Sequence, residues 1–553
     1  MVLNQYIKRI QDLVPEFDLS ALDLSKNPEF DLALPLFKLA AENKQKPQDI
    51  FLALEQKIKN LSIVQELVFL NGFLNIKLNQ LEFKKDLFKV LIKENSAFPV
   101  FTPNDRAYFI DYSSPNVAKF FSVGHLRSTV IGNSLKQILK YTGSSVFGEN
   151  YLGDWGTQFG KMIYAYENWL DAAEFKKNPL QHLQSLYVRF HKEAEARPEL
   201  DDEARAIFKK LEDKNEKYLE LWRQFREISI AEFLKIYKLL GVEFENISGE
   251  SYYNDKMQPV IDKLKSLKVL KTDAGAQIVL LGEDIPPALL VRKDGATLYL
   301  TRDLTALEHR LNKHNFTDIL YVVGNEQKLH FEQLKRLTKI YGLDTNINHV
   351  GFGLVLTNGK KMSTREGKTK GLHALLDLAI DGAKSIILEK RPETKEIDYL
   401  AEKIGVGAII FNDLKNDRTL DFEFNLNQAL KFEGQTGPYV QYTIVRIASI
   451  LEGKTPDFKK FNEDYLTKEF WPVLKLIDSF KSTIAKSAET LMPSTVAKYL
   501  LNLCASFNKL YAQTHFTVAD KLVENTNMCF LYFVRLVLEK GLKLLGICPI
   551  DKM

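Results

Sequence analysis

The sequence predicts a multidomain chain of the α/β and α classes, in which a parallel-sheet domain with a helical insertion stands between a small α/β domain and a helical bundle. Three observations predict it. Short apolar runs alternate with helical patterns after residue 105, a long charged helical stretch interrupts that alternation, and every long segment beyond about residue 375 has helical period. At 553 residues and 45% hydrophobic content, the chain can bury several cores.

Residues 1–104 are predicted to form the small α/β domain. Its opening, MVLNQYIKRIQDLV, carries charges on every helical turn, which predicts an amphipathic helix and argues against a secretory signal. Further on, VQELVFLNGFLNIKL alternates apolar and polar residues around Asn71 and Gly72. Because an Asn-Gly pair readily adopts the positive φ angles of a tight turn, we expect a β-hairpin at this point.

Residues 105–375 are predicted to form a Rossmann-like parallel-sheet domain. The run YFIDY is a short buried strand, Gly124 to Tyr141 a helix that ends before Gly143, and SVFGENYLGDWG the next strand and loop. Residues 171–284 are mostly charged helical sequence and are predicted to be an insertion. Strands are then expected at ATLYLT, DILYVVG and HVGFGLVL, so that the parallel sheet resumes.

The C-terminal third is predicted to be helical throughout, with a connecting region over residues 376–420 and a helical domain over residues 421–553. Its most apolar stretch, from Cys529 to Ile547, is interrupted by charged residues, so we expect no membrane span. The formal net charge of +4 permits a nucleic-acid partner without requiring one.

The three cysteines, Cys504, Cys529 and Cys548, include no Cys-x-x-Cys pair. We therefore expect no structural zinc and no other metal bound by protein ligands. A reducing compartment, the cytoplasm, is the simplest setting for such a chain.

A polar loop between a strand and a helix is the first candidate site. Residues 113–132 follow the apolar strand and lead into the helix, so unpaired N–H groups and the helix dipole favour a phosphate ligand there. A second, turn-rich loop from Gly359 to Thr369 offers lysines, a hydroxyl and an arginine. Two Gly-Lys-Thr triplets lack the earlier glycine of a P-loop, since Met362 and Ala448 occupy those positions, and no Gly-x-Gly-x-x-Gly follows a strand. A Walker-type NTPase is therefore rejected, and a dinucleotide oxidoreductase is not supported.

These two loops resemble the HIGH and KMSKS signatures of class I aminoacyl-tRNA synthetases, and the surrounding motifs resemble those of the arginyl-tRNA synthetase family of class Ia. Each short motif is weak evidence alone, whereas six in the family's order, spread over most of the chain, are specific. The matching motifs are Ser114–Lys119, Gly124–Thr129, Gly153–Gly160, Tyr299–Asp303, Lys361–Arg365 and Gly541–Gly546.

The resemblance implies a ligase that joins L-arginine to tRNA(Arg) in two steps. ATP and arginine give arginyl-adenylate and pyrophosphate, and the arginyl group then moves to the 2′-hydroxyl of the terminal adenosine. Phosphoryl transfer of this kind needs positioning and charge stabilisation more than acid–base chemistry, with Mg²⁺ bridging the ATP phosphates. The residues implied to be catalytic are Lys119, His125, Lys361 and Ser363, and those implied to bind ATP are Ser122, Gly124, His125, Lys361 and Met362.

The guanidinium of arginine is planar and permanently charged, so its site needs carboxylates placed for bidentate contact. The resemblance implies Asp111 and Asp303 in this role, although the family often has the longer Glu at position 111. Tyr299 would pack on the guanidinium plane. The implied site is completed by Ser114, Asn116 and Gln327. Asp111, Asn116, Tyr299, Asp303 and Gln327 all fall at or just beyond the carboxyl ends of expected strands, where α/β sheets bind ligands.

For tRNA, residues 421–553 resemble a helical anticodon-binding domain in which Tyr442 and Arg446 are placed for stacking and phosphate contact. The N-terminal domain resembles the family's extra domain that touches the tRNA elbow. Its hairpin would offer Asn71, Phe73 and Asn75. We expect a monomer whose partners are tRNA(Arg), L-arginine and ATP.

Simpler explanations stay open for single residues: His125 as a helix cap, Lys119 as a solvated surface lysine, Tyr299 and Phe73 as core, and Arg446 as a solvated side chain. The sequence also departs from the family, because Ser122 replaces the first histidine of HIGH and Thr364 the second lysine of KMSKS. We predict that Lys119 compensates for the missing charge. The alternative function is a catalytically weakened relative that acts as a tRNA- or protein-binding module. A smaller adenylyltransferase is disfavoured, because it would not need residues 376–553.

Overall fold

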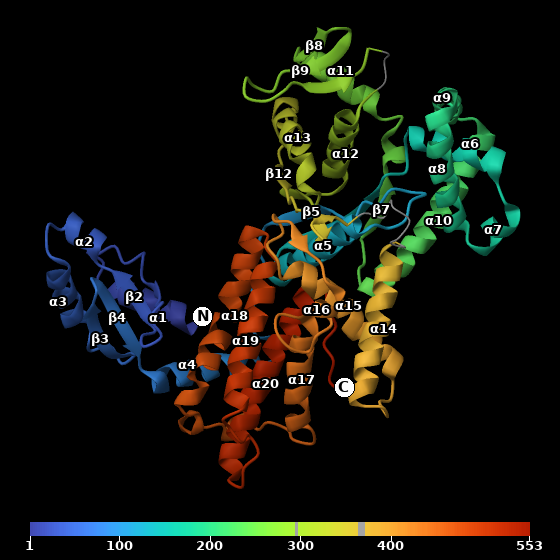
Figure 1. Ribbon diagram of the computed structural model, residues 1–553. Helices are drawn as coiled ribbons and strands as arrows, with labels where there is room; N and C mark the ends of the chain where they lie inside the picture. Colours follow the sequence, from blue (N-terminus) through green and yellow to red (C-terminus); the bar gives the residue numbers. More distant parts are fainter. Residues whose placement is uncertain (294–296, 363–370, 553) are drawn as a thin grey trace.

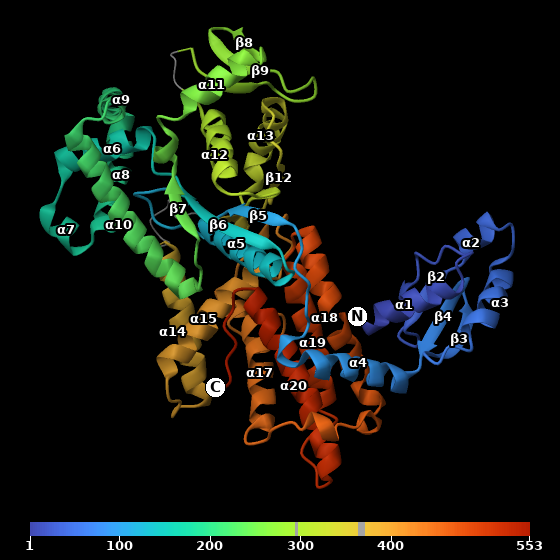
Figure 2. The same ribbon diagram turned by 180° about the vertical axis from the view of Figure 1, so that it is seen from behind.

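A computed structural model describes residues 1–293, 297–362 and 371–552 (Figures 1 and 2). Its centre is a parallel sheet with the strand order β12-β11-β5-β6-β7, which confirms the predicted parallel sheet. Chain order reverses on either side of β5, and ligands of such sheets bind beyond the carboxyl ends of the strands at that point. The strands are β5 (Ala107–Asp111), β6 (Ser145–Leu152), β7 (Asn246–Gly249), β11 (Asp318–Tyr321) and β12 (Asn346–His349).

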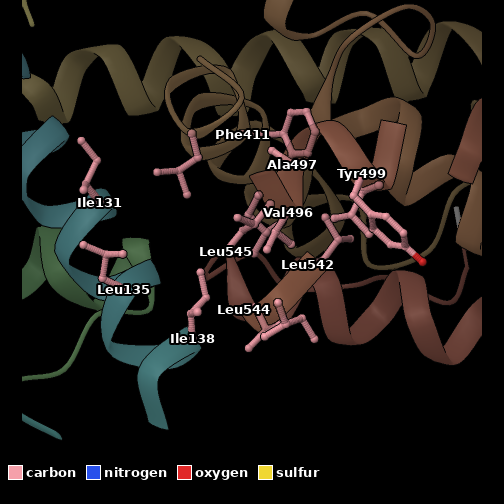
Figure 3. Packing of buried hydrophobic residues seen from close by; sticks show 14 of the residues in the cluster. Ile131, Leu135, Ile138, Phe411, Val496, Ala497, Tyr499, Leu542, Leu544 and Leu545 are labelled. Carbon is pink, nitrogen blue, oxygen red and sulfur yellow. The ribbon is translucent and has the colours of Figure 1, made fainter. Parts of the chain in front are cut away.

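Helix α5 (Val123–Tyr141) joins the sheet to the C-terminal helices. Ser122 caps its first turn, and Gly143, with a φ of +92°, lets the chain turn back toward β6. One side of the helix packs on the C-terminal bundle. There Ile131, Leu135 and Ile138 share a hydrophobic core with Phe411, Val496, Leu542, Leu544 and Leu545 (Figure 3). The helix that begins at the candidate loop is therefore also part of the core shared by two regions.

The strand prediction at ATLYLT is wrong for its described residues, because Tyr299 begins helix α12 (Tyr299–Lys313). Leu300, Leu304 and Leu307 recur at helical spacing and are buried. This longer helical period outweighs the β propensity of the short window that suggested a strand.

The strand predictions at DILYVVG and HVGFGLVL have different outcomes. The first is confirmed as β11, whereas the second divides into β12 and β13 (Val355–Thr357). Between these two strands, a Cβ on Gly353 would lie 2.5 Å from the backbone of Leu420. The glycine thus marks a close approach of two backbones where the regular ladder is interrupted.

The segment predicted as a helical insertion contains only helices in its first part and mixes strands with one longer helix in its second. After Leu240 it contributes β7 to the parallel sheet and then enters a separate antiparallel sheet with the order β10-β9-β8. The four residues of β7 show no alternation, so only their pairing with β6 defines them as a strand. The helices are α6 (Thr157–Trp169), α7 (Ala172–Lys177), α8 (Pro179–Ala196), α9 (Glu199–Glu212), α10 (Glu216–Leu240) and α11 (Met257–Ser266), and the strands β8 (Leu270–Asp273), β9 (Ala276–Val279) and β10 (Ala288–Val291).

The N-terminal residues fold as a sheet with helices, and the predicted hairpin is confirmed. Asn71 and Gly72, with φ of +53° and +77°, form the turn between β3 (Val64–Leu70) and β4 (Phe73–Leu78). The other elements are α1 (Val2–Leu13), β1 (Asp23–Leu24), β2 (Leu32–Pro35), α2 (Phe37–Glu42), α3 (Pro47–Ile58) and α4 (Gln80–Glu94).

This N-terminal region is docked on the C-terminal helices. Buried Asp478 accepts the backbone N–H groups of Val2 and Leu3 at 2.7 and 3.1 Å, and Asp31 accepts the Trp471 indole N–H at 3.0 Å. In both ribbon views the sheet of this region and helices α6–α10 lie on opposite sides of the molecule (Figures 1 and 2). Two peripheral regions thus flank the central sheet.

The C-terminal part is helical apart from short strands, as predicted. Among the described helices, none combines the length and apolar composition needed to cross a bilayer. Its elements are α14 (Leu372–Lys390), α15 (Ile397–Leu414), β15 (Phe422–Glu423), α16 (Leu426–Ala429), α17 (Gly437–Leu451), α18 (Trp471–Thr490), α19 (Ser494–Tyr511) and α20 (Lys521–Leu544). Two further elements precede them, α13 (Lys328–Tyr341) between β11 and β12, and β14 (Lys360–Lys361) after β13.

Candidate active site

The loop after β5 adopts a backbone that L-residues rarely take without support. Ser113 and Ser114 have φ of +74° and +47°. The Ser113 N–H donates to the Ser128 Oγ at 2.8 Å, and the Ser114 N–H donates to the Asn150 Oδ1 at 3.1 Å. Side chains of α5 and β6 therefore fix this loop from both sides.

The next turn of the loop is fixed by close packing. Asn116 forms a parallel bridge with Gly153, where an added Cβ would lie 2.4 Å from the Asn116 Oδ1. Ala118, also at positive φ, donates its N–H to the Ser229 Oγ of α10 at 2.9 Å. The glycine at 153 thus leaves room for the predicted site residue Asn116, which is half-buried.

Ser122 and His125 bond to each other across the first turn of α5. The Ser122 Oγ accepts the His125 backbone N–H at 3.3 Å, and the His125 Nδ1 lies 3.1 Å from the Ser122 backbone N–H, which donates to it. Because Nδ1 is an acceptor, the ring proton is on Nε2. Burial, with the charge of Lys119, lowers the pKa of His125 to about 4. His125 is thus a neutral donor through Nε2 at physiological pH.

Gly124 and Lys119 both precede that histidine in the sequence. Gly124 is exposed, and a Cβ there would meet only the Ser122 Oγ, at 3.6 Å, so the helix start is open to a ligand. Lys119 is half-buried, with its Nζ 5.2 Å from the centre of the Tyr187 ring. It is therefore not a fully solvated surface lysine.

The second loop contacts the first one through the described residues that follow it. Lys361 is exposed at the end of β14, and the Met362 N–H donates to the Val355 carbonyl at 2.9 Å. Ser363 and Thr364 lie outside the described residues. On the far side, the Leu372 N–H donates to the Phe121 carbonyl at 2.8 Å, just before the cap of α5. The two candidate loops thus meet at the helix start.

Tyr299 and Asp303 lie on the first turns of α12, not at the end of a strand as the pattern suggested. Tyr299 is 63% exposed, which excludes a core role for it. The Asp303 Oδ2 lies 2.6 Å from the His330 Nε2, in a pair whose side chains are about a quarter exposed at 23% and 24%. Gln327 is exposed and ends a short 3-10 helix after β11.

Asp111 is 4% exposed and already has partners. Its Oδ1 accepts the Ser114 hydroxyl at 2.9 Å, and its Oδ2 lies 2.9 Å from the Nη2 of Arg310, which is 2.6 Å from the Glu149 Oε2. Burial raises the pKa of Asp111 to about 6; the positive charge of Arg310 opposes this shift and the negative charge of Glu149 adds to it. Asp111 and Ser114 are therefore brought together, as predicted for one site.

Arg310 and Glu149 are residues that the sequence reasoning missed. The Arg310 guanidinium is buried between the Phe109 and Tyr151 rings, at 5.0 and 4.8 Å from their centres. Helical spacing places Arg310 on the same side of α12 as Asp303, seven residues earlier, which is a signal that could have found it. A cavity of about 620 Å³ opens beside this cluster and is lined by both Glu149 and Arg310.

Asp111 and Asp303 both act electrostatically on one hydroxyl group, that of Tyr321. Burial raises the pKa of Tyr321, at the end of β11, and the charges of both carboxylates add to that rise while Arg310 opposes it. The two predicted guanidinium contacts are thus coupled to the same residue of the central sheet.

The three predicted hairpin residues have different environments. Asn71 is exposed at the turn, and Phe73 is half-buried with its ring edge-on to Phe37 at 6.1 Å. Asn75, in contrast, is 5% exposed, and its amide donates to the Val68 and Phe73 carbonyls. Its role as a tRNA contact stays a prediction; in the free protein the amide bonds within the hairpin.

The predicted pair on the C-terminal domain forms a stack at the surface. The Arg446 guanidinium lies 5.1 Å from the Tyr442 ring centre and 4.7 Å from that of Tyr511, and it donates to the Asn508 side chain. Both tyrosines are more than a third exposed. Tyr511, which the sequence reasoning missed, completes a platform of the kind on which bases stack.

The side chains of the described residues form no candidate metal site. In residues 1–293, 297–362 and 371–552 there is no group of three or more histidine, cysteine, aspartate or glutamate side chains placed to hold a metal ion.

Comparison with known families matches nearly the whole chain. The profile described as "tRNA synthetases class I (R), catalytic domain" matches residues 86–426. The "Arginyl tRNA synthetase N terminal domain" matches residues 2–78, and the "DALR anticodon binding domain" matches residues 440–553. The central match contains all the residues described above around β5, α5 and α12.

Individual relatives also match over nearly the full length of this chain. The arginine–tRNA ligase of Exiguobacterium sibiricum is 44% identical over 529 residues, which cover 95% of this chain and 93% of that protein. The arginine–tRNA ligase of Enterococcus faecalis is 43% identical over 532 residues, which again cover 95% of this chain and 93% of that protein. Among solved structures, the arginyl-tRNA synthetase of Plasmodium falciparum matches with a TM-score of 0.82 at 26% identity, covering 100% of this chain and 98% of that one.

Proposed function

Because this chain belongs to the arginyl-tRNA synthetase family of class I, and so is an arginine–tRNA ligase, we propose which of its residues carry each part of the reaction. The family implies arginine, ATP and tRNA(Arg) as its partners. Two observations support the proposal. The loop after β5 bonds through Phe121 to Leu372, which follows the second loop. Asp111 at the end of β5 and Asp303 on α12 both act electrostatically on Tyr321 at the end of β11.

Asp303 is the direct carboxylate contact of the substrate guanidinium. Its side chain is partly open and oriented by His330, whereas Asp111 is closed off by Ser114 and Arg310. Asp111 therefore adds negative charge next to the guanidinium and positions the loop, and Tyr299 covers the site from the helix start. Asn116 and Gln327 hold the backbone end of arginine.

ATP binds over the start of α5. The open surface at Gly124 lets adenosine approach the backbone, together with Met362, and the Nε2–H of His125 donates to a phosphate oxygen. Lys119 and Lys361 supply positive charge to the triphosphate, and Ser363, outside the described residues, supplies a hydroxyl. Mg²⁺ bound together with ATP would supply further positive charge to the phosphates.

The first step is then a displacement in line at phosphorus. A carboxylate oxygen of arginine attacks the α-phosphorus, the bond to the β-phosphate oxygen breaks, and pyrophosphate leaves with the electron pair. In the second step the 2′-hydroxyl of the terminal adenosine attacks the activated carbonyl carbon, and AMP leaves. The residues named above act by placing the two reactants and by stabilising charge, so no enzyme nucleophile is needed.

Ser122 serves as the cap that orients His125, not mainly as a phosphate contact. Its hydroxyl oxygen already accepts a helix N–H, and its own N–H fixes the tautomer of the histidine. The replacement of the usual histidine at this position therefore leaves the donor of His125 intact. A weakened binding module is accordingly not favoured, because the buried groups around the amino-acid site are all present.

For tRNA, we assign the hairpin turn with Asn71 and Phe73 to one contact and the stack of Tyr442, Arg446 and Tyr511 to another. The first lies on the N-terminal sheet and the second on helices α17 and α19 of the C-terminal bundle. Exposed aromatic and amide groups suit single-stranded or loop RNA at both places.

The test is arginine-dependent charging of tRNA by the purified full-length protein, measured together with ATP–pyrophosphate exchange in the presence and absence of tRNA. We expect both reactions with arginine, and the exchange to depend on tRNA, as the resemblance implies. Exchange that proceeds equally without arginine, or no charging of any tRNA, would reject the proposal.

A further inference from the structure

Arg127 is a buried arginine to which neither the proposed chemistry nor the core gives an obvious role. It lies on α5 two residues after His125, is 1% exposed, and heads the set of largest fully buried side chains. A buried guanidinium is costly unless its donors are all satisfied, so its partners indicate what it holds.

The partners of Arg127 come from two distant segments of the chain. Its Nη1 donates to the Gly353 carbonyl at 2.6 Å, and its Nε forms an ion pair with the Asp413 Oδ2 at 3.2 Å. The rings of Phe352 and Phe422 lie 5.6 and 5.0 Å from the guanidinium carbon. Weaker bonds reach the carbonyls of Leu420 and Arg418 at 3.3 and 3.4 Å. Three nitrogen atoms of one guanidinium thus bind residues that lie more than 220 positions away.

Both segments lead to the second loop. Gly353 lies two positions before the first residue of β13, and β13 pairs with β14, which ends at Lys361. Phe422 lies on β15, which pairs with β13 from the other side, in register with Val355. The guanidinium therefore holds the base of the strand ribbon that carries Lys361.

The same helix also contacts the far end of the second loop through the bond between Phe121 and Leu372. That contact is a single backbone bond at the start of α5. The Arg127 cluster lies one turn further along, where a charged group is enclosed by a carboxylate, carbonyls and two rings. It is the stronger of these two contacts between described residues.

We propose that Arg127, with Asp413, is a positioning pair that sets the distance between His125 and Lys361 for adenylate formation. This inference rests on the proposed function. The planar fork of arginine is required because it binds carbonyls and a carboxylate in different directions at once, which the point charge of a lysine cannot do. Burial raises the pKa of Asp413, and the charge of Arg127 opposes that shift.

The test compares Arg127→Lys and Asp413→Asn with Lys136→Met in the full-length protein. Lys136 is a matched control, since it is equally buried on α5 and pairs with Glu245 at 2.8 Å, but neither partner belongs to the second loop. The measurement is tRNA-dependent ATP–pyrophosphate exchange at a temperature where circular dichroism shows each variant folded, with KM determined for arginine and for ATP.

We expect Arg127→Lys to lower kcat by on the order of ten- to a hundred-fold, with KM for arginine within about two-fold of wild type, because the reactants bind but the charged groups are misplaced. Asp413→Asn should also lower kcat. If Arg127→Lys does not fold, the comparison of Asp413→Asn with wild type and Lys136→Met tests the inference. Lys136→Met should lower thermal stability and keep kcat within about two-fold.

The inference is overturned if both variants keep the wild-type kcat, or if Lys136→Met loses as much kcat as they do. A loss confined to arginine KM would equally contradict it. These outcomes presuppose an active wild-type protein; if the wild type shows no arginine-dependent exchange, the proposed function fails first, and the inference fails with it.

Discussion

The two loops that meet at the proposed ATP site are held in opposite ways. In the first, backbone N–H groups donate to side chains of α5, β6 and α10, which surround it. In the second, Lys361 is exposed on a short ribbon, and the turn before it is held by Glu423, which accepts the Gly359 N–H at 3.3 Å. One half of the site is enclosed by the fold, and the other extends from it.

This difference follows from what each loop must do. Three non-glycine residues of the first loop have positive φ, a conformation that needs bonds from outside the loop to persist. Lysines that reach a triphosphate need length and access more than a fixed backbone. We therefore expect changes in the first loop to lower activity and stability together, and changes at the exposed lysines to lower activity alone.

The largest effect is expected at His125. His125→Ala should lower kcat for adenylate formation by on the order of a hundred- to a thousand-fold, because it removes a donor aimed at developing phosphate charge. His125→Gln should retain more activity than alanine, since its amide nitrogen can occupy the place of Nε2. With a pKa near 4, the histidine should contribute no step to the pH–rate profile above pH 5. Equal kcat for the glutamine and alanine variants would contradict the assignment of Nε2 as the donor.

A smaller effect, confined to activity, is expected at Lys361. Lys361→Ala should lower kcat/KM for ATP by on the order of a hundred-fold, through the loss of one charge-assisted contact. Its melting temperature should stay that of the wild type, because the side chain is exposed. The matched control is Lys360→Ala, at the neighbouring position of the same strand. If Lys360→Ala lowers kcat/KM for ATP as much as Lys361→Ala does, the phosphate contact is not specific to position 361.

A substitution of Asn150 tests the first loop, which is the enclosed half of the proposed site. Asn150 is buried, accepts the Ser114 N–H and donates to the Tyr237 hydroxyl at 2.9 Å. Asn150→Ala should cost about 1–3 kcal/mol of folding free energy and raise KM for arginine by on the order of ten-fold, since the positive φ of Ser114 loses its support. Denaturant unfolding and exchange kinetics measure the two effects on one sample. A loss of stability with unchanged KM would separate the loop's conformation from arginine binding.

The sequence predicted the parallel sheet, the hairpin and His125 because each has a local signal: alternation, an Asn-Gly turn, and a motif at a helix start. It could not predict Arg127, whose partners lie at Gly353 and Asp413. Only the folded chain brings these three together.

The strand prediction at ATLYLT fails for a similar reason. This short window has β propensity, and only the burial of leucines further along shows a helix. Asn75 lies in a strand that was predicted correctly, but its neighbours in the sheet enclose it. Accessibility, ion pairing and the type of short elements thus depend on contacts beyond the local window.

The smallest effect on activity is expected from the titration of Asp111. Its folded pKa, about 6, is above the ordinary value of 3.8, so the stability it contributes is fully present below pH 3.8 and is lost as pH rises through 6. Asp111→Asn should remove this loss, which amounts to up to about 3 kcal/mol. The ionised carboxylate should, in contrast, favour arginine, so kcat/KM should rise a few-fold over the same range in the wild type.

The pH experiment needs one control. Burial raises the pKa of Glu250, which pairs with Arg302 at 3.0 Å, to about 7. A step in the pH profile of stability or kcat/KM that persists in Asp111→Asn and disappears in Glu250→Gln would assign the titration to Glu250. That result would contradict the role given to Asp111.

The most direct measurement of the central claim is tRNA-dependent ATP–pyrophosphate exchange with arginine and with citrulline, its uncharged isostere, for the wild type and for Asp303→Asn. Asp303 is the partly open carboxylate that the start of α12 presents to the guanidinium. We predict that the wild type prefers arginine by at least a hundred-fold and that Asp303→Asn loses most of this preference, through a fall in kcat/KM for arginine of on the order of a hundred-fold or more. An Asp303→Asn enzyme with the wild-type kcat/KM for arginine, or a wild type that uses citrulline equally well, would contradict the account.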